Sequence, residues 1–315
     1  MLRGIAILLV AVWTSAGQET SVVITPRVHE NTRPSAAPSQ ANIRIDSNLV
    51  LVPVTVADRL NRFVSGLEQE DFRIFEDEAE QKIVSFGSED APLSMGIVFD
   101  TSGSMGNKLS MSRVAVAELF KIVNPEDEGF LVEFSSRPEL IVPFTHRPGE
   151  IEARLLSTRS KGSTALLDGV ALALRTMRGA HNPRKALILI TDGGDNHSRY
   201  TEAEVREKVQ EAYVQIYAIG IYGGGSSPEE YYGPNLLRSL SELTGGHHFA
   251  AELSQLPDVA AKIGVELRNQ YLIGYSPANH ARDGRFRRIQ VRLKPPPGLP
   301  PLRAWWRQGY YAPTQ

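Results

Sequence analysis

The sequence predicts an α/β protein: a doubly wound, mostly parallel sheet inserted into a small β-sandwich that the two flanking segments form together. In the middle of the chain, apolar runs with strand character alternate with stretches of helical periodicity, which favours a parallel sheet with helices on both faces. Residues 43–91 and 270–315 are rich in strand-forming residues and show no helical period. Neither flank has enough strands for a stable sandwich of its own, so we expect the two flanks to pair.

The composition is that of an ordinary globular protein, and a chain of 315 residues is long enough to bury a large core. The formal net charge of -2 gives no reason to expect nucleic acid or an anionic membrane surface as a partner. The chain contains no cysteine, which excludes disulfides, thiolate metal sites and a cysteine nucleophile.

The N-terminus predicts export. A basic start at residues 1–3 and an apolar run at residues 4–13, followed by small residues, are typical of a secretory signal peptide. The run is too short to span a bilayer comfortably, so no transmembrane segment is expected after signal removal. A frayed apolar N-terminus of a cytosolic protein is the alternative. We expect a signal peptide at residues 1–17, a flexible linker at residues 18–42 and a periplasmic or extracellular protein.

The flanks contain the expected strands of the sandwich. Residues 48–58 are extended and β-branched, although Pro53 argues for an edge strand or a bulge. Residues 72–86 predict two strands around an acidic turn at residues 77–79. The second flank predicts three strands, at residues 271–275, 286–293 and 302–311.

The middle domain, expected over residues 92–253, supplies the parallel sheet. Apolar runs predict strands at residues 95–99, 129–134, 186–191 and 214–220. Apolar positions at helical spacing predict helices at residues 110–123, 151–156, 165–177, 202–213 and 235–243. A last helix at residues 257–268 lies in a connecting segment, residues 254–269, that leads into the second flank.

Side chains with oxygen atoms follow the ends of the expected strands. Asp100, Ser102 and Ser104 come directly after the first apolar strand, and residues 162–164 and 191–195 supply further hydroxyls and carboxylates. In an open parallel sheet, ligands gather at the carboxyl ends of the strands, near the switch in strand order. Carboxylates and hydroxyls in small loops suit Mg²⁺ or a similar divalent ion. The alternative is that these loops hold only turn and N-cap residues.

Three motifs in this order resemble the loops of a von Willebrand factor A domain, a doubly wound, Rossmann-like fold. They are Asp-Thr-Ser-Gly-Ser at 100–104, Gly-Ser-Thr-Ala-Leu at 162–166 and Ile-Thr-Asp-Gly-Gly-Asp-Asn at 190–196. The first matches the D-x-S-x-S pattern of that family, and the resemblance covers about half of the chain. The whole chain more loosely resembles the exported VWFA-related proteins of Acidobacteria, through Leu-Val-Pro-Val-Thr-Val near Leu51, Glu-Asp-Phe-Arg-Ile-Phe-Glu-Asp near Glu70 and Tyr-Leu-Ile-Gly-Tyr near Tyr271.

The resemblance implies a metal-ion-dependent adhesion site with ligands from all three loops. The implied ligands are the hydroxyls of Ser102 and Ser104, the carboxylates of Asp100 and Asp192, directly or through water, and Thr164, directly in one conformation. Two carboxylates roughly neutralise a divalent ion, and neutral hydroxyls fill further positions. Such an ion can accept an acidic side chain from a partner protein.

Three further residues, Thr101, Ser163 and Asp195, are candidates for the outer coordination shell of the ion. Asp168, four residues after Thr164 on the expected helix, is expected to face a loop rather than the ion. Mg²⁺ is the favoured ion, with Mn²⁺ and Ca²⁺ as alternatives.

Two classes of function are consistent with this site. The first is an exported module for adhesion or assembly, which binds the Asp or Glu of a protein partner through the ion. The second is a metal-dependent hydrolase, which needs a general base beside the ion and a substrate pocket, and the sequence shows neither. A scaffold with an unused metal site is a third alternative. We predict the binding module and no enzymatic activity.

Overall fold

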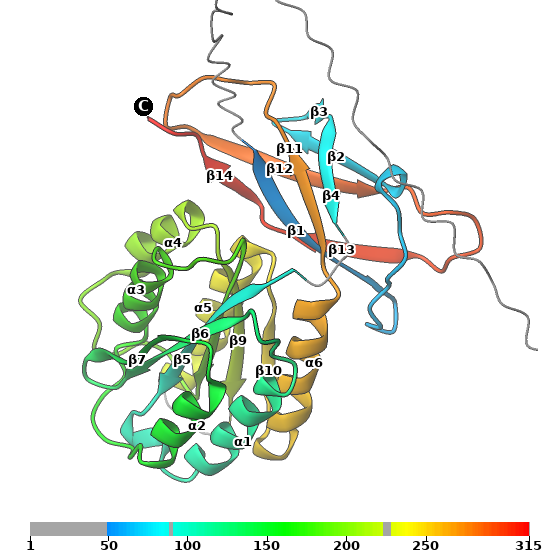
Figure 1. The fold of residues 1–315 in the computed structure, drawn as a ribbon. Coiled ribbons are helices and arrows are strands. Elements are labelled where there is room, and N and C mark those ends of the chain that lie inside the picture. The colour runs from blue at the N-terminus through cyan, green and yellow to red at the C-terminus, as the bar shows by residue number, and fades with distance from the viewer. Residues whose placement is uncertain (1–48, 88–90, 223–227, 315) are drawn as a thin grey trace, which may run out of the picture. The chain divides into compact units, whose positions relative to one another are not determined.

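The computed structural model describes residues 49–87, 91–222 and 228–314 (Figure 1). The expected signal peptide and linker lie outside these residues. Within the described part of the chain, no helix is both long and apolar enough to cross a bilayer. The strands of that part form one sheet of six strands and two sheets of four.

The six-stranded sheet has the order β10-β9-β8-β5-β6-β7. Its strands are β5 (Leu93–Asp100), β6 (Glu128–Phe134), β7 (Pro138–Thr145), β8 (Arg184–Thr191), β9 (Gln215–Ile221) and β10 (His248–Ala251). All neighbours run parallel except β6 and β7, which confirms the expected fold class. The sequence pattern does not predict β7 and β10, because these edge strands are only partly buried and lack a continuous apolar run.

Helices cover both faces of this sheet. In the described residues they are α1 (Leu109–Phe120), α2 (Pro148–Leu156), α3 (Leu166–Met177), α4 (Glu202–Glu211), α5 (Pro228–Thr244) and α6 (Leu256–Arg268). The first core contains α1, α2 and α6, and the second contains α3, α4 and α5. On β5, Ile97 and Phe99 belong to the first core and Val98 to the second. Burial on both faces explains the continuous apolar run of this strand.

The other two sheets each contain strands from both flanks, in the orders β13-β1-β11-β4 and β14-β12-β2-β3. Their strands are β1 (Val50–Asp58), β2 (Phe72–Glu76), β3 (Ala79–Gln81), β4 (Ile83–Gly87), β11 (Tyr271–Tyr275), β12 (Phe286–Leu293), β13 (Leu302–Trp306) and β14 (Gly309–Tyr311). Val52, Ile74, Ile273 and Val291, from four of these strands, share one buried core. The flanks therefore form the joint sandwich that the sequence predicts.

Two strand predictions in the flanks are wrong in detail. The second arm of the hairpin at residues 72–86 divides into β3 and β4, and the strand expected at residues 302–311 divides into β13 and β14. In both cases the two pieces join different sheets. A strand at the corner of a sandwich can bend from one sheet to the other, so pairing between the flanks decides where it breaks. The acidic turn is confirmed, with φ of 46° at Asp77 and 71° at Glu78, as two-residue hairpin turns require.

Pro53 lies in an interior strand, which corrects the expectation of an edge strand or a bulge. β1 pairs with β11 on one side and with β13 on the other. Pro53 is opposite Leu272 of β11, whereas the register with β13 begins at Val54. Because proline has no N–H to donate, it is tolerated where one side of a strand has no partner.

Candidate metal centre

The candidate site lies at the carboxyl ends of two adjacent strands of the central sheet. β5 pairs in parallel with β6 on one side and with β8 on the other, so the strand order changes direction at β5. Asp100 is the last residue of β5, Thr191 is the last residue of β8, and Asp192 follows directly. Ligands of doubly wound sheets bind at such a switch point.

Asp100 is fully buried, and both of its carboxylate oxygens accept hydrogen bonds. The backbone N–H of Ser102 donates to Oδ1 over 2.8 Å, and the hydroxyl of Thr191 donates to Oδ2 over 2.6 Å. These two bonds connect the loop after β5 to the end of β8. The pKa of Asp100 is raised to about 6: burial is the main cause, the negative charge of Asp192 adds to it, and the hydrogen bonds from Thr191 and Ser102 oppose it.

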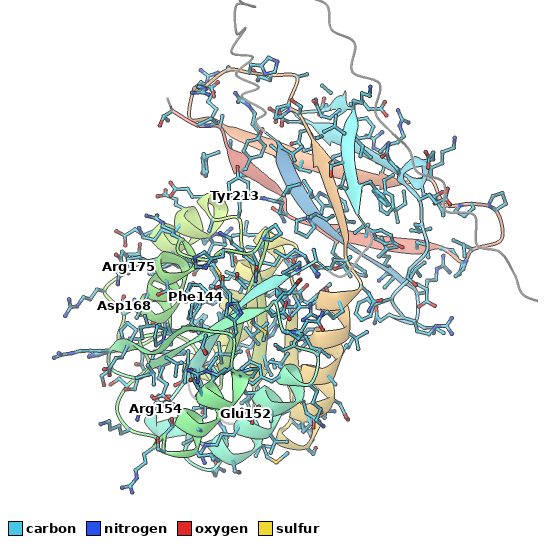
Figure 2. All side chains as sticks on the ribbon, viewed as in Figure 1. Phe144, Glu152, Arg154, Asp168, Arg175 and Tyr213 are labelled. Atoms are coloured by element: carbon cyan, nitrogen blue, oxygen red, sulfur yellow. The ribbon has the colours of Figure 1, made fainter. Side chains whose placement is uncertain are left out.

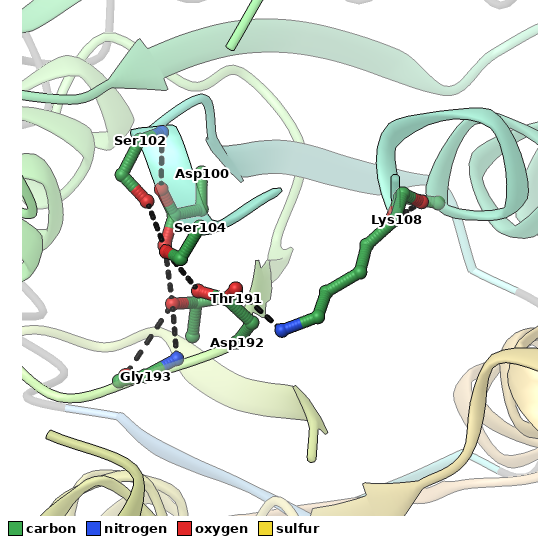
Figure 3. Close-up of polar contacts among 8 residues, drawn as sticks. Asp100, Ser102, Ser104, Lys108, Thr191, Asp192 and Gly193 are labelled. Carbon is green, nitrogen blue, oxygen red and sulfur yellow. Dashed lines mark hydrogen bonds and ion pairs between the residues drawn. The ribbon is translucent and has the colours of Figure 1, made fainter. Parts of the chain in front are cut away.

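Ser102, Ser104, Asp192 and Lys108 form one connected series of polar contacts (Figure 3). A short 3₁₀ turn at Gly103–Met105 brings the hydroxyl oxygen of Ser104 within 3.1 Å of that of Ser102. The Ser104 hydroxyl donates to Oδ1 of Asp192 over 2.9 Å. The Lys108 ammonium donates to Oδ2 of the same carboxylate over 2.7 Å. Three of the four side chains are the predicted ligands of the first and third loops.

Backbone hydrogen bonds hold the second loop against the other two. The N–H of Gly103 donates to the carbonyl of Gly162 over 2.9 Å. On the other side, the N–H of Thr164 donates to Oδ1 of Asn196 over 2.9 Å. Thr164 is 5% exposed, and its loop adjoins the first loop through the bond between Gly103 and Gly162.

The three outer-shell candidates have other contacts that hold the loops in place. The hydroxyl of Thr101 donates to the carbonyl of Phe134 in β6 over 3.0 Å. The N–H of Ser163 donates to the hydroxyl of Ser136 over 3.0 Å. Asp195 accepts a hydrogen bond from the N–H of Leu167, in the first turn of α3, over 3.2 Å.

Asp168, on α3, faces a loop as the sequence predicts (Figure 2). Its Oδ1 accepts hydrogen bonds from the backbone N–H groups of Arg199 and Tyr200, over 2.9 and 3.1 Å. Asp168 therefore stabilises the segment before α4.

The donors present fit a hard divalent ion. Together with Asp100, the series supplies two buried carboxylates and two hydroxyls, and a hydroxyl that donates its proton keeps lone pairs for an ion. The ion pair with the Lys108 ammonium shows that the Asp192 carboxylate binds a cationic group in this position. In the described residues, no group of three or more His, Cys, Asp or Glu could hold a metal. Asp100, Ser102, Ser104, Thr164 and Asp192 are the residues that would hold such an ion.

A family model described as the von Willebrand factor type A domain matches residues 95–194, a segment that begins in β5 and ends in the loop after β8. This part of the chain is a von Willebrand factor type A domain. An uncharacterized protein of Borreliella burgdorferi is 27% identical over 179 residues, which are 48% of this chain and 51% of that protein. Inter-alpha-trypsin inhibitor heavy chain H4 of Bos taurus is 25% identical over 147 residues, 42% of this chain and 16% of that protein. The chain thus spans only part of either relative.

Solved structures are similar to this chain at low identity. A von Willebrand factor type A protein from Catenulispora acidiphila is 14% identical with a TM-score of 0.49, and the match covers 86% of this chain and 75% of that chain. The PilB minor pilin from Streptococcus sanguinis is 16% identical with a TM-score of 0.48, covering 58% of this chain and 63% of that chain.

Sequence reasoning missed Lys108 of the von Willebrand factor type A domain, and it placed Thr191 in the third loop without assigning it to the site. Thr191 ends an apolar strand, where a threonine is an ordinary residue, yet its hydroxyl binds Asp100. Lys108 lies four residues after Ser104, just before the expected helix, where a lysine normally faces solvent. The proximity of Lys108 to the first loop along the chain is the signal that could have found it.

Proposed function

We propose that this protein is an exported module for adhesion or assembly, which binds a protein partner through a divalent cation. The observation that supports it best is the series of contacts from Ser102 through Ser104 to Asp192, beside the buried Asp100. All of these groups present hard oxygen donors, and they lie where doubly wound sheets bind ligands. The von Willebrand factor type A domain in this segment agrees with the proposal.

The residues of the three loops have separate roles in the proposal. Ser102 and Ser104 would bind the ion through hydroxyl lone pairs, and Ser104 can do so while still donating to Asp192. Asp100 and Asp192 would supply the negative charge, directly or through water. Thr164 would join from the second loop in one conformation.

The partner in this proposal presents an acidic side chain. The ion supplies an electrophilic position for one oxygen of that carboxylate, and the loops supply two carboxylates and neutral hydroxyls. Mg²⁺ fits this donor set, and Mn²⁺ and Ca²⁺ are the alternatives to compare. The proposal includes export, because residues 1–17 have the pattern of a signal peptide.

The test is calorimetric titration with Mg²⁺, Mn²⁺ and Ca²⁺ of the wild type, Asp100→Asn and the control Asp168→Asn. Asp100→Asn removes a charge from the site, whereas Asp168→Asn removes a charge from the same domain outside it. We expect one binding event in the wild type and the control, and a loss of at least about 100-fold in affinity in Asp100→Asn.

The same three proteins, immobilised, then test the partner. Proteins of a cell-envelope extract should be retained with Mg²⁺, released by EDTA and not retained by Asp100→Asn. Substitution of one Asp or Glu in the retained partner should abolish binding. Metal binding without any such partner would contradict the binding function, and a substrate turned over with Mg²⁺ would favour the hydrolase.

A further inference from the structure

Lys108 and Asp192 form a buried ion pair inside the candidate metal centre. The side chain of Lys108 is 11% exposed and that of Asp192 is 2% exposed. Lys108 precedes α1 as its N-cap residue, and its stem reaches from there to the end of β8 (Figure 3). A buried pair of this kind is broken only at a large energetic cost, unless another cation replaces the ammonium.

We infer that Lys108 is an internal counter-cation, which neutralises Asp192 in the metal-free protein and leaves it when a divalent ion binds. The inference rests on the proposed function and adds a competitor from the chain itself. It assigns to Lys108 a positioning role, because the residue acts on the ion through Asp192.

The first argument is electrostatic. Asp192 binds Ser104 through Oδ1 and Lys108 through Oδ2, so an ion shared by Ser104 and Asp192 would lie only a few ångströms from the ammonium. Two positive charges at that separation repel, and the burial of Asp192 and of most of Lys108 strengthens the repulsion. The nearby carboxylates, Asp100 and Asp192, can balance two positive charges but not three.

The second argument is that Lys108 can move without unfolding the loop. Its backbone is held by a bond from its N–H to the carbonyl of Met105, and its carbonyl accepts from the N–H of Ser112. Only the flexible four-carbon stem has to swing toward solvent. The first turn of α1 contains no acidic residue that would hold the ammonium elsewhere in that turn.

Lys108 therefore has two opposite effects. It stabilises the metal-free loops, because it compensates a buried carboxylate. It weakens the affinity for the ion, because the ion pair has to be broken first. Replacing Lys108 with a neutral residue should therefore lower the stability of the metal-free protein and raise its affinity for the ion. If Lys108 only packed in the structure, its replacement would not raise the affinity.

The first experiment compares the wild type with Lys108→Met and with the control Lys121→Met. Lys121 follows the other end of α1, is 69% exposed and pairs with Glu118. In EDTA, Lys108→Met should lower Tm by about 5–10 °C. In calorimetry, it should raise the affinity for Mg²⁺ by about 10-fold or more. Lys121→Met should change neither quantity.

The outcomes separate this inference from the proposed function. Equal Mg²⁺ affinity of the wild type and Lys108→Met would overturn the inference and leave the function standing. Tighter binding by Lys108→Met supports the inference. Binding by Lys108→Met alone would overturn both, because the lysine would then block the site permanently and would never leave Asp192. If neither protein binds any ion, both are wrong.

A second experiment needs no variant and stays decisive if Lys108→Met fails to fold. The wild type is acetylated with an N-hydroxysuccinimide ester in EDTA or in Mg²⁺, and each lysine is followed by mass spectrometry. We expect the acetylation rate of Lys108 to rise by about 10-fold or more with Mg²⁺, since its amine is released from burial. The rate at Lys121 should stay constant. An unchanged rate at Lys108 under conditions where Mg²⁺ is bound would contradict its displacement.

Discussion

The α/β domain and the sandwich each bury a carboxylate to 2% exposure, and they satisfy it with different donors. In the sandwich, Glu76 accepts hydrogen bonds from the hydroxyls of Tyr275 and Tyr310, over 2.7 and 2.8 Å. In the α/β domain, Asp192 accepts from a loop serine and from an ammonium on a flexible stem. Both carboxylates accept hydrogen bonds from protein donors, but only at Asp192 are the donors ones that an ion could replace.

The difference indicates what separates a structural carboxylate from a candidate ligand. Tyr275 and Tyr310 are rings fixed in strands β11 and β14, and burial raises the pKa of both, with Glu76 raising it further. They remain neutral donors, and no ion can replace them without disrupting the core. Around Asp192, a hydroxyl with free lone pairs and a lysine that can swing outward allow replacement.

The largest expected effect comes from breaking the cluster in the sandwich. Glu76→Ala leaves two buried tyrosine hydroxyls without their acceptor and should lower the free energy of unfolding by about 4 kcal/mol. Mg²⁺ affinity should not change. Denaturant unfolding in EDTA, with calorimetry on the folded protein, measures both. The control Glu80→Ala, at a side chain 48% exposed, should lower the free energy of unfolding far less. If Glu76→Ala lowers the free energy of unfolding no more than Glu80→Ala does, Glu76 is not a structural carboxylate and its contrast with Asp192 is wrong.

A smaller effect should appear as pH dependence at the candidate metal centre. The pKa of Asp100 is raised from 3.8 to about 6, so the folded metal-free protein binds this proton more tightly than the unfolded chain. Asp100 should therefore add stability as pH falls from about 6 to about 4, by up to about 3 kcal/mol, and this gain is lost as pH rises through 6.

Unfolding in EDTA between pH 7 and pH 4 tests this, with the wild type compared to Asp100→Asn. The difference in stability between the two proteins should vary with pH in that window and be constant above it. Saturating Mg²⁺ should abolish the gain, since the ion requires the ionised carboxylate. A difference that does not vary with pH in EDTA would mean that Asp100 titrates normally in the fold.

The smallest effect sharpens the comparison within the sandwich. Tyr310→Phe removes one of the two hydroxyls on Glu76 and leaves the other, so we expect a loss of about 1 kcal/mol. Tyr311→Phe, the neighbouring residue with a weaker bond of 3.3 Å to Gln210, is the control and should cost less. Equal losses would show that Glu76 does not depend on its second donor.

Much of the candidate site could be predicted because its residues follow strands that are recognisable in the sequence. An apolar run that ends in Asp100 sets Ser102 and Ser104 at the edge of the sheet, and Asp192 follows a second such run. Lys108 could not be predicted in this way, since a lysine at the start of a helix normally faces solvent. Its burial depends on β5 and β8 being neighbours, which is a property of the tertiary fold.

The sandwich was less predictable than the α/β domain for a related reason. The pairing of the two flanks could be predicted from their strand content, whereas the break between β13 and β14 depends on which sheet each piece meets. Pro53 illustrates the same limit. The sequence shows a proline in a strand, but only the lengths of the neighbouring strands show that one side of it is without a partner.

The two flanks have a mechanical consequence. The chain leaves the sandwich after β4 to enter the α/β domain and returns to it at β11, and Gly87 of β4 lies opposite Leu272 of β11. Tension between the two flanks would be carried by the strand pairs that join them, β1 with β11 and β13, β2 with β12, and β4 with β11. The inserted domain would lie outside the path of that force until those strands separate, whereas force applied through a partner bound to the domain would act on it directly.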